Sequence, residues 1–275
     1  MNLSIITINY NNNVGLERTI KSVVGQNLQN IEFIVVDGSS TDGSVEIIKN
    51  NEVYISKWIS EKDNGIYNAL NKGIKMATND YLLFLNSGDH LFSNTVLSTI
   101  DKHISGEDLI CFDIHVLGQG FDQINKHPNK ISFSFLFHET LAHQSVFIKR
   151  SLFDKVGFYD ESLKIVSDWK FFIHALAYHN CTYKSVHEIL SVYYLDGISS
   201  TAEGTFTRRA EREKILKEEF SIFYEDYIEL QKLEMNRFKM LSEIEKTSFG
   251  MKFLNVVLRI YIVLFSKREL KDILN

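Results

Sequence analysis

Short apolar runs alternate with segments of helical periodicity over the first third of the chain. The runs Leu3–Ile8, Ile31–Val36 and Tyr81–Leu85 are long enough for buried strands, and each is followed directly by a polar turn. Ahead of the third run, Ile66 and Leu70 lie at the spacing of one helix face. Parallel strands joined by helices produce this alternation. The chain is therefore predicted to be α/β, with a mixed, mostly parallel sheet flanked by helices.

The same patterns predict further elements along the chain. They are helices over Gly15–Gly25, up to Lys49, over Asn94–His103 and from Asp168 onward, and strands over Tyr54–Ile59, Leu109–Leu117 and Gln144–Ile148. The segment Gly118–Lys130 contains the only proline, Pro128, and is predicted to be an irregular, mobile loop.

Composition narrows the class of protein. At 275 residues, with 44% hydrophobic residues, the chain can bury a full core in one large domain or in a domain with an appendage. The formal net charge of -5 argues against a nucleic-acid partner. Cys111 and Cys181 fit no metal-ligand spacing, so we expect buried thiols in a reducing compartment. The first ten residues predict a strand and not a signal peptide. A cytoplasmic location follows.

Mixed charges appear at helical spacing from about residue 205. The charged residues are Arg208, Arg209, Glu211, Arg212, Glu213, Lys214, Lys217, Glu218 and Glu219. We expect them to form a solvated helix face within a helical C-terminal extension, residues 205–275.

The segment Phe249–Phe265 is strongly apolar, but Lys252, Asn255 and Arg259 interrupt it. On a helix these polar residues fall in one narrow stripe, which argues against a membrane-spanning segment. Basic residues follow within 267–271. Two alternatives stay open: the helix lies in an anionic membrane surface, peripheral on the inner face of the cytoplasmic membrane, or it packs on protein, including a second copy of the chain.

Polar side chains stand where two predicted neighbouring strands end. Asp37 follows one buried strand, and Thr7, Asn9 and Tyr10 close the other. Open α/β sheets bind ligands at the carboxyl ends of their strands. A carboxylate there can accept from a nucleobase N–H or a ribose hydroxyl, with the other three side chains around the base. The alternative is that Asp37 and Asp42 cap turns, and for Asp42 we favour it.

The run Tyr81–Leu85 ends in Asn86-Ser87-Gly88-Asp89, a small-residue turn with one carboxylate. Such a turn can present a metal or phosphate ligand, or can be an ordinary aspartate turn. On the helix before this run, Asn68 and Asn71 share a polar face that can hold sugar hydroxyls or phosphate oxygens.

Five segments occur in order over about residues 1–200: Ser4–Asn11, Val35–Ser44, Glu61–Gly73, Phe84–Asp89 and Val166–Trp169. Together they resemble family 2 glycosyltransferases of the GT-A (Rossmann-like) fold, in particular bacterial members that build surface polysaccharides and lipopolysaccharide. The resemblance implies a catalytic domain over 1–204, with a nucleotide-sugar-binding half (1–89) and an acceptor-binding half (90–204), followed by the extension 205–275.

The resemblance also implies roles for single residues. Asp89 would bind Mn²⁺ or Mg²⁺ together with the donor diphosphate. Asp168 would be the general base, although a plain helix N-cap is compatible with the same position. Donor contacts are expected from Thr7, Asn9, Tyr10, Asp37, Asp63, Asn68, Asn71, Ser87 and His143. Gly38 stands where many members carry a second aspartate.

Three further positions leave alternatives open. His143 could stabilise the leaving group or be a satisfied core histidine. The spacing of His127 and His138 matches no helical ligand pair. The segment Asp196–Ser200 resembles a loop that closes over the donor, but its residues are also ordinary loop residues.

The resemblance implies an inverting, metal-dependent glycosyltransferase. It would move a hexose or N-acetylhexosamine from a nucleotide sugar, UDP-linked, to a hydroxyl of a lipid-linked or oligosaccharide acceptor. A nucleotidyltransferase is a weaker alternative, because the turn Asn9–Gly15 has no basic, glycine-rich loop for a triphosphate. A non-catalytic sugar-binding protein would tolerate loss of Asp89 or Asp168, yet both are present.

Overall fold

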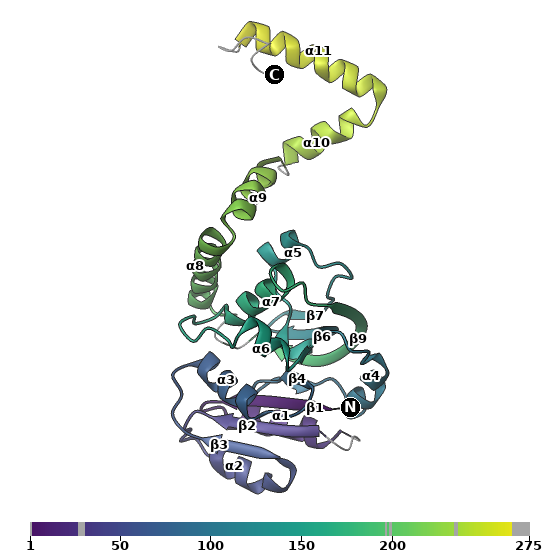
Figure 1. The fold of residues 1–275 in the computed structure, drawn as a ribbon. Helices are drawn as coiled ribbons and strands as arrows, with labels where there is room; N and C mark the ends of the chain where they lie inside the picture. The colour runs from purple at the N-terminus through teal and green to yellow at the C-terminus, as the bar shows by residue number, and fades with distance from the viewer. Residues whose placement is uncertain (1, 27–30, 196, 198–199, 234–235, 266–275) are drawn as a thin grey trace. The chain divides into compact units, whose positions relative to one another are not determined.

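The computed structural model describes residues 2–26, 31–195, 197, 200–233 and 236–265. The chain divides into two compact units, residues 1–215 and 216–275. The first unit contains one twisted sheet with helices on both faces (Figure 1).

The strands of the described residues run in the order β3 (Lys57–Ser60), β2 (Ile31–Asp37), β1 (Leu3–Asn9), β4 (Tyr81–Phe84), β8 (Val146–Lys149), β6 (Leu109–Gly118), β9 (Tyr183–Tyr194) and β5 (His90–Leu91), and β7 (Phe121–Asn125) pairs with β6. The strands β3, β2, β1 and β4 are parallel to one another, and β6 is parallel to β9. The strand β8 is antiparallel to β4 and β6, and β5 is antiparallel to β9. The predicted mixed α/β sheet is confirmed.

The helices of the first unit are α1 (Asn13–Val24), α2 (Ser44–Asn50), α3 (Ile66–Met76), α4 (Val96–Ile100), α5 (Phe133–His138), α6 (Leu152–Val156) and α7 (Ser167–Ala177), together with most of α8 (Ala202–Glu219), which ends in the second unit. Short 3-10 turns occupy Glu52–Tyr54, Asp101–His103 and His143–Ser145. The expected strand over Tyr54–Ile59 thus begins later, at Lys57, because a 3-10 turn ends at Tyr54.

Alternate residues of each central strand face opposite helix layers, as the two-residue period of a strand requires. On one face, Ile6 and Phe84 pack with residues of α3, α6 and α7. On the other face, Ile5 and Leu83 pack with residues of α1, α2 and α4. Burial of each such large apolar side chain stabilises the fold by about 1.5–3 kcal/mol.

Gly73 lets α3 lie directly on β1. A Cβ atom at this position would come within 2.4 Å of Ile6 Cγ2, which is closer than real Cβ contacts allow. The close approach fixes the height of α3 over the sheet, and with it the position of Tyr67 on the first turn of that helix.

The segment Gly118–Lys130 differs from its prediction. Phe121–Asn125 forms β7, which pairs antiparallel with Ile114–Gly118 of β6, and His127 is buried. The hydrogen-bonding groups of β6 therefore order much of a segment for which the sequence predicts an irregular loop. Almost all side chains of β7 are exposed, on both faces of the strand. Such a strand does not need alternating apolar residues, so a search for a two-residue period does not find it.

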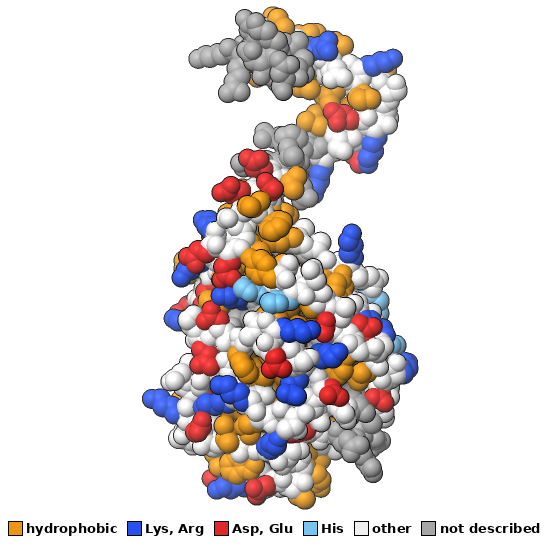
Figure 2. Space-filling model, in the orientation of Figure 1, with side chains coloured by type: hydrophobic (Ala, Val, Ile, Leu, Met, Phe, Trp, Pro, Cys, Tyr) orange, Lys and Arg blue, Asp and Glu red, His pale blue; other side chains and the backbone are white. Residues whose placement is uncertain are grey.

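The second unit contains α9 (Ser221–Leu233), α10 (Asn236–Glu245) and α11 (Ser248–Phe265). Among the described residues, α11 is a helix with the length and composition to cross a membrane. Its 18 residues span about 27 Å at about 1.5 Å per residue. Most of its apolar side chains are exposed, and apolar surface of this unit is visible in Figure 2.

Candidate active site

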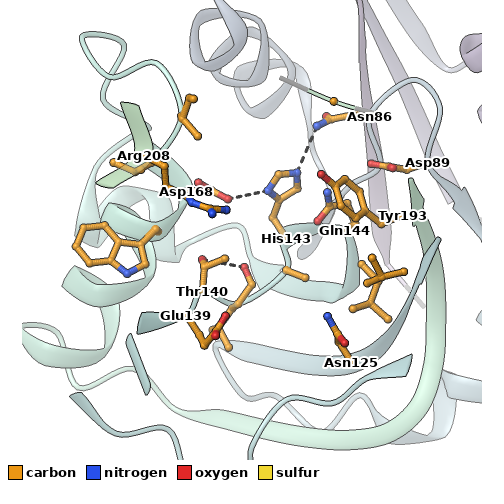
Figure 3. A pocket seen from close by; sticks show the side chains of 18 of the residues that line it. Asn86, Asp89, Asn125, Glu139, Thr140, His143, Gln144, Asp168, Tyr193 and Arg208 are labelled. Carbon is orange, nitrogen blue, oxygen red and sulfur yellow. Dashed lines mark hydrogen bonds and ion pairs between the residues drawn. The ribbon is translucent and has the colours of Figure 1, made fainter. Parts of the chain in front are cut away.

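A cavity of about 770 Å³ lies beside the β4–β5 turn. Its walls come from α3, the β4–β5 turn, β6, β7, the segment 139–144, the start of α7, the end of β9, and α8 (Figure 3). Of the predicted site residues, Ser87, Asp89, His143 and Asp168 line this cavity. The others, Thr7, Asn9, Tyr10, Asp37, Asp63, Asn68 and Asn71, do not.

A chain of polar contacts runs from Asp168 through His143 to Asn86 (Figure 3). His143 Nδ1 lies 3.0 Å from Asp168 Oδ2, and an ionised carboxylate can only accept, so Nδ1 donates. His143 Nε2 lies 3.3 Å from Asn86 Nδ2. The packing of Phe84 edge-on against the imidazole, with ring centroids 6.3 Å apart, helps to hold the ring in place. Both ring nitrogens of His143 therefore have polar partners, and the residue also lines the cavity.

Asp168 is the second residue of α7, and Val166 is the N-cap, so the alternative of a plain N-cap was wrong. The carboxylate still lies in the first turn, where the helix dipole favours negative charge. Its Oδ1 accepts from the Tyr67 hydroxyl at 3.1 Å, and the hydroxyl also contacts the Ile165 carbonyl oxygen at 2.5 Å. The side chain is 14% exposed.

The electrostatic environment keeps Asp168 ionised. Burial raises the pKa of the carboxyl, but the hydrogen bond and the charge of His143 outweigh that effect, together with hydrogen bonds from the Trp169 amide and Tyr67. The pKa of Asp168 therefore lies below its ordinary value of 3.8. Conversely, burial raises the pKa of Tyr67 well above its ordinary range, and the adjacent Asp168 charge raises it further, so the hydroxyl stays a donor.

Helix α8 forms one wall of the cavity, which sequence reasoning missed. Glu211 accepts from the amides of Lys164, Ile165 and Val166 at 2.7–3.3 Å, and so it holds the entry to α7. Arg212 donates to the His138 carbonyl oxygen at 2.8 Å. The prediction of a wholly solvated charged face was wrong on this side of the helix.

The Arg212 guanidinium also stacks on an aromatic ring. Its Cζ lies 5.1 Å from the centre of the Trp169 ring, within the range of a cation–π contact. Burial lowers the pKa of Arg212 to about 10, against the raising effect of the Asp168 charge. One sequence signal could have predicted this contact. Arg208, Arg212 and the buried Ile215 are spaced by four and three residues, which places them on one face of the helix.

The β4–β5 turn presents oxygen atoms to the cavity. Thr19 Oγ1 donates to the Asp89 carbonyl oxygen at 2.6 Å and accepts from the Gly88 amide at 3.0 Å. Gly88 has a φ of 109°, which favours glycine. Asn86 Oδ1 is buried and has no hydrogen-bond partner among the described residues. Ser87 accepts from Asn12 Nδ2 through its carbonyl oxygen at 3.1 Å.

The carboxyl ends of β1, β2 and β3 lie level, because Asn9 is in register with Asp37, and Asp37 with Ser60. The buried Asp37 carboxylate accepts from Asn9 Nδ2, the Ser40 amide and hydroxyl, and the Ser60 hydroxyl at 2.6–2.9 Å. Burial raises its pKa, but these hydrogen bonds outweigh burial and lower it. The Asp37 carboxylate thus accepts hydrogen bonds from the protein itself.

The other predicted base-flanking residues differ in access. Thr7 is buried and donates to the Leu85 carbonyl oxygen at 2.7 Å, a contact between β1 and the segment after β4. Tyr10 is 69% exposed. A Cβ atom at Gly38 would lie 3.0 Å from Asp63 Oδ2. Asp63 therefore lies next to the position at which many family members carry a second aspartate. Asp63 Oδ1 also accepts from Lys72 Nζ at 2.6 Å.

The polar face of α3 contacts the segment before α7. Asn71 is 3% exposed, its Nδ2 donates to the Tyr159 carbonyl oxygen and to Glu161 Oε1, and its Oδ1 accepts from the Tyr159 amide. Asn68 Nδ2 donates to Glu161 Oε2 at 2.8 Å. In this structure both side chains join α3 to residues 159–161, and the expected sugar contacts would require them to exchange these partners.

The expected closing loop Asp196–Ser200 lies largely outside the described residues, although Gly197 lines the cavity. Among the described residues no group of three His, Cys, Asp or Glu side chains is placed to hold a metal ion. A cation in the cavity would thus need further ligands from a bound molecule.

Comparison with known proteins identifies the family. The sequence profile described as "Glycosyl transferase family 2" matches residues 4–166, more than half of the chain. The chain belongs to this family, and it is a glycosyltransferase.

Individual relatives agree with this assignment. An uncharacterized glycosyltransferase of Mycobacterium tuberculosis, Rv1514c, is 33% identical over 209 residues, which cover 73% of this chain and 78% of that protein. A PGL/p-HBAD biosynthesis glycosyltransferase of Mycobacterium bovis is 26% identical over 205 residues, covering 72% of this chain and 79% of that protein.

A solved structure shares the fold. The crystal structure of S. aureus TarS 1-349 in complex with UDP-GlcNAc superposes with a TM-score of 0.60 at 18% identity, covering 78% of this chain and 67% of that chain. In another TarS crystal structure this chain covers 37% of the longer chain. The GT-A fold expected from the sequence is thereby confirmed.

Proposed function

We propose that this glycosyltransferase is inverting and uses Asp168 as its general base. The observation that carries the proposal is the Asp168 carboxylate, which lines the cavity, is held by His143 and Tyr67, and has a lowered pKa. An ionised carboxylate in a fixed orientation can take a proton from an acceptor hydroxyl at neutral pH. His143 and Tyr67 act on this group as positioning residues.

The bond changes follow from these positions. The acceptor hydroxyl loses its proton to Asp168 as its oxygen attacks the anomeric carbon of the donor sugar. The bond from that carbon to the diphosphate oxygen breaks, and the nucleoside diphosphate leaves with the electron pair. Because attack is from the side opposite the leaving group, an α-linked donor gives a β-linked product.

The donor is proposed to be a UDP-linked hexose or N-acetylhexosamine. The TarS crystal structure in complex with UDP-GlcNAc supports this choice. The acceptor is proposed to be a hydroxyl of a lipid-linked or oligosaccharide intermediate of surface polysaccharide synthesis, which the PGL/p-HBAD biosynthesis relative supports. A nucleotidyltransferase activity is disfavoured by membership of the glycosyltransferase family.

A divalent cation, Mn²⁺ or Mg²⁺, fits the β4–β5 turn. Asp89 lines the cavity there, and the buried Asn86 Oδ1 lacks a hydrogen-bond partner within the described part of the chain. Carboxylate and amide oxygens are the ligands that these hard cations prefer. Bound there, the cation would neutralise charge on the leaving diphosphate. With one carboxylate in the turn, we expect the metal and the nucleotide to bind together.

The second unit is proposed to place the enzyme at the inner face of the cytoplasmic membrane. On α11, Lys252, Asn255 and Arg259 form a polar stripe, and exposed apolar side chains cover the opposite side. A helix of this pattern can lie in a membrane surface with its apolar side buried. Self-association through the same apolar surface is the alternative.

The base assignment predicts a specific kinetic defect. Asp168→Asn keeps the shape and an acceptor for His143 but cannot take a proton, so kcat should fall by about 10²–10⁴ while UDP affinity stays near wild type. Asp160→Asn is the matched control, because Asp160 contacts Ser162 and Lys170 and does not line the cavity. Steady-state transfer and calorimetry with UDP measure both quantities. Near wild-type kcat in Asp168→Asn would refute the assignment.

The metal proposal predicts a loss of coupling between Mn²⁺ and UDP. Groups that merely orient metal ligands are worth about 10–100-fold in affinity, so Asp89→Asn should weaken UDP binding in the presence of Mn²⁺ by at least about tenfold. Asp42→Asn is the control, since Asp42 accepts from the Asn13 amide and from Ser44 in a turn. Calorimetric titration with and without Mn²⁺ distinguishes the two. If Mn²⁺ increased the affinity for UDP equally in both variants, the metal site would have to lie elsewhere.

The membrane proposal predicts an asymmetric response along α11. Val257→Asp with Leu264→Asp places charge opposite the polar stripe and should reduce flotation with anionic phosphatidylglycerol vesicles by at least about tenfold, since a buried charge costs about 2.5–3.5 kcal/mol. Asn255→Asp adds charge within the stripe and should have little effect. Unchanged flotation in the double variant, or a wild-type protein that stays with the soluble fraction, would contradict membrane contact; light scattering then tests self-association.

A further inference from the structure

Two arginines project from successive turns of α8 into the cavity wall beside Asp168. Arg212 is committed to the protein, through the His138 carbonyl oxygen and the Trp169 ring. Arg208 lines the cavity and is half-buried, yet its guanidinium has no hydrogen bond or ion pair with the described residues. The five donors of this guanidinium are thus left to water or to a ligand in the cavity, and an anionic ligand can accept from several of them at once.

A second cation lies on the same wall. Lys164 lines the cavity, and its main-chain amide is fixed by Glu211 of α8. Unlike Arg208, Lys164 is exposed, and its ammonium group has no ion pair within the described part of the chain. Glu211 lies three residues, about one helical turn, from Arg208, and it therefore fixes the backbone at Lys164 close to the turn that carries Arg208.

Electrostatics favours an anion at this wall. Arg208 and Arg212 are four residues apart on one helix, a spacing at which like charges repel. The charges of Asp168 and Glu139 both act on Arg212, but the carboxylate oxygens of Asp168 already accept from His143 and Tyr67. An incoming anion would relieve the repulsion and could accept two parallel bonds from the guanidinium, the geometry that suits phosphate.

The wall lies away from the place proposed for the donor diphosphate. In Figure 3, Arg208 and Asp168 lie on one side of His143, and Asn86 and Asp89 lie on the other. If the diphosphate lies at the β4–β5 turn, a second anion beside Arg208 belongs to the molecule whose hydroxyl meets Asp168. That molecule is the acceptor.

We propose that Arg208 and Lys164 form a phosphate-binding subsite for the acceptor. The acceptor class is then a phosphorylated one, in which a phosphate or diphosphate group lies near the hydroxyl that is glycosylated. This inference rests on the proposed function, because the acceptor side is defined by Asp168. It makes Arg208 a determinant of acceptor specificity.

A phosphomonoester titration tests the subsite in the full chain. The protein is first saturated with UDP and Mn²⁺, so that the donor diphosphate position is filled, and glycerol 3-phosphate is then titrated by calorimetry. We expect binding in wild type, with Kd raised by about tenfold or more in Arg208→Gln, as for loss of a charged hydrogen bond. Neutral glycerol should not bind.

Arg209→Gln is the matched control, because Arg209 is the next residue on α8, is exposed and does not line the cavity. It should bind glycerol 3-phosphate and UDP as wild type does. Wild-type affinity for glycerol 3-phosphate in Arg208→Gln, or an equal loss in Arg209→Gln, would overturn the subsite.

A parallel titration of glycerol 3-phosphate without UDP distinguishes the two groups that Arg208 could bind, a phosphate of the acceptor and the diphosphate of the donor. Binding that occurs only without UDP would assign Arg208 to the donor diphosphate and overturn an acceptor subsite. Failure of the proposed function is seen separately, as absence of UDP binding or of sugar transfer. The phosphate titration of wild type and Arg208→Gln remains readable in that case.

Discussion

The contact between His143 Nδ1 and Asp168 Oδ2 is the interaction on which the rest of the site depends. It joins the short turn before β8 to the first turn of α7, two segments 25 residues apart. A carboxylate that is largely removed from water needs a charged partner and hydrogen bonds to stay ionised. His143, Tyr67 and the Trp169 amide satisfy that requirement, and each is supplied by a different element or turn of the fold.

The elements around this contact are arranged so that it can form. Antiparallel pairing of β4 with β8 brings the His143 turn next to the β4–β5 turn, and the close approach of α3 at Gly73 brings Tyr67 to Asp168. A lowered pKa means that the folded state binds this proton less tightly than the unfolded state does. The contact therefore stabilises the fold above the unfolded pKa, and this contribution is lost as the pH falls through the lowered value.

Much of the fold and some of the site could be predicted from the sequence, for local reasons. The strands before Asp37 and Asp89 are apolar runs that end in polar turns, and helix α7 begins near Asp168. These signals lie within a few residues of one another. The wall formed by α8 could not be predicted in this way, because the contacts of Glu211 with Lys164–Val166 span more than 40 residues and mixed charge alone resembles a solvated face. Likewise, the strand pattern placed Asp37 at the carboxyl edge of the sheet, but its hydrogen bonds depend on the register with neighbouring strands.

His143 keeps Asp168 ionised against the effect of burial, and carbon-13 NMR of carboxyl-labelled aspartate measures this directly. The Asp168 resonance is assigned by its loss in Asp168→Asn. In wild type the resonance should titrate below 3.8, and in His143→Ala its midpoint should rise, because burial then raises the pKa with less opposition. A wild-type midpoint at or above 3.8, or one that His143→Ala leaves unchanged, would contradict this role of His143.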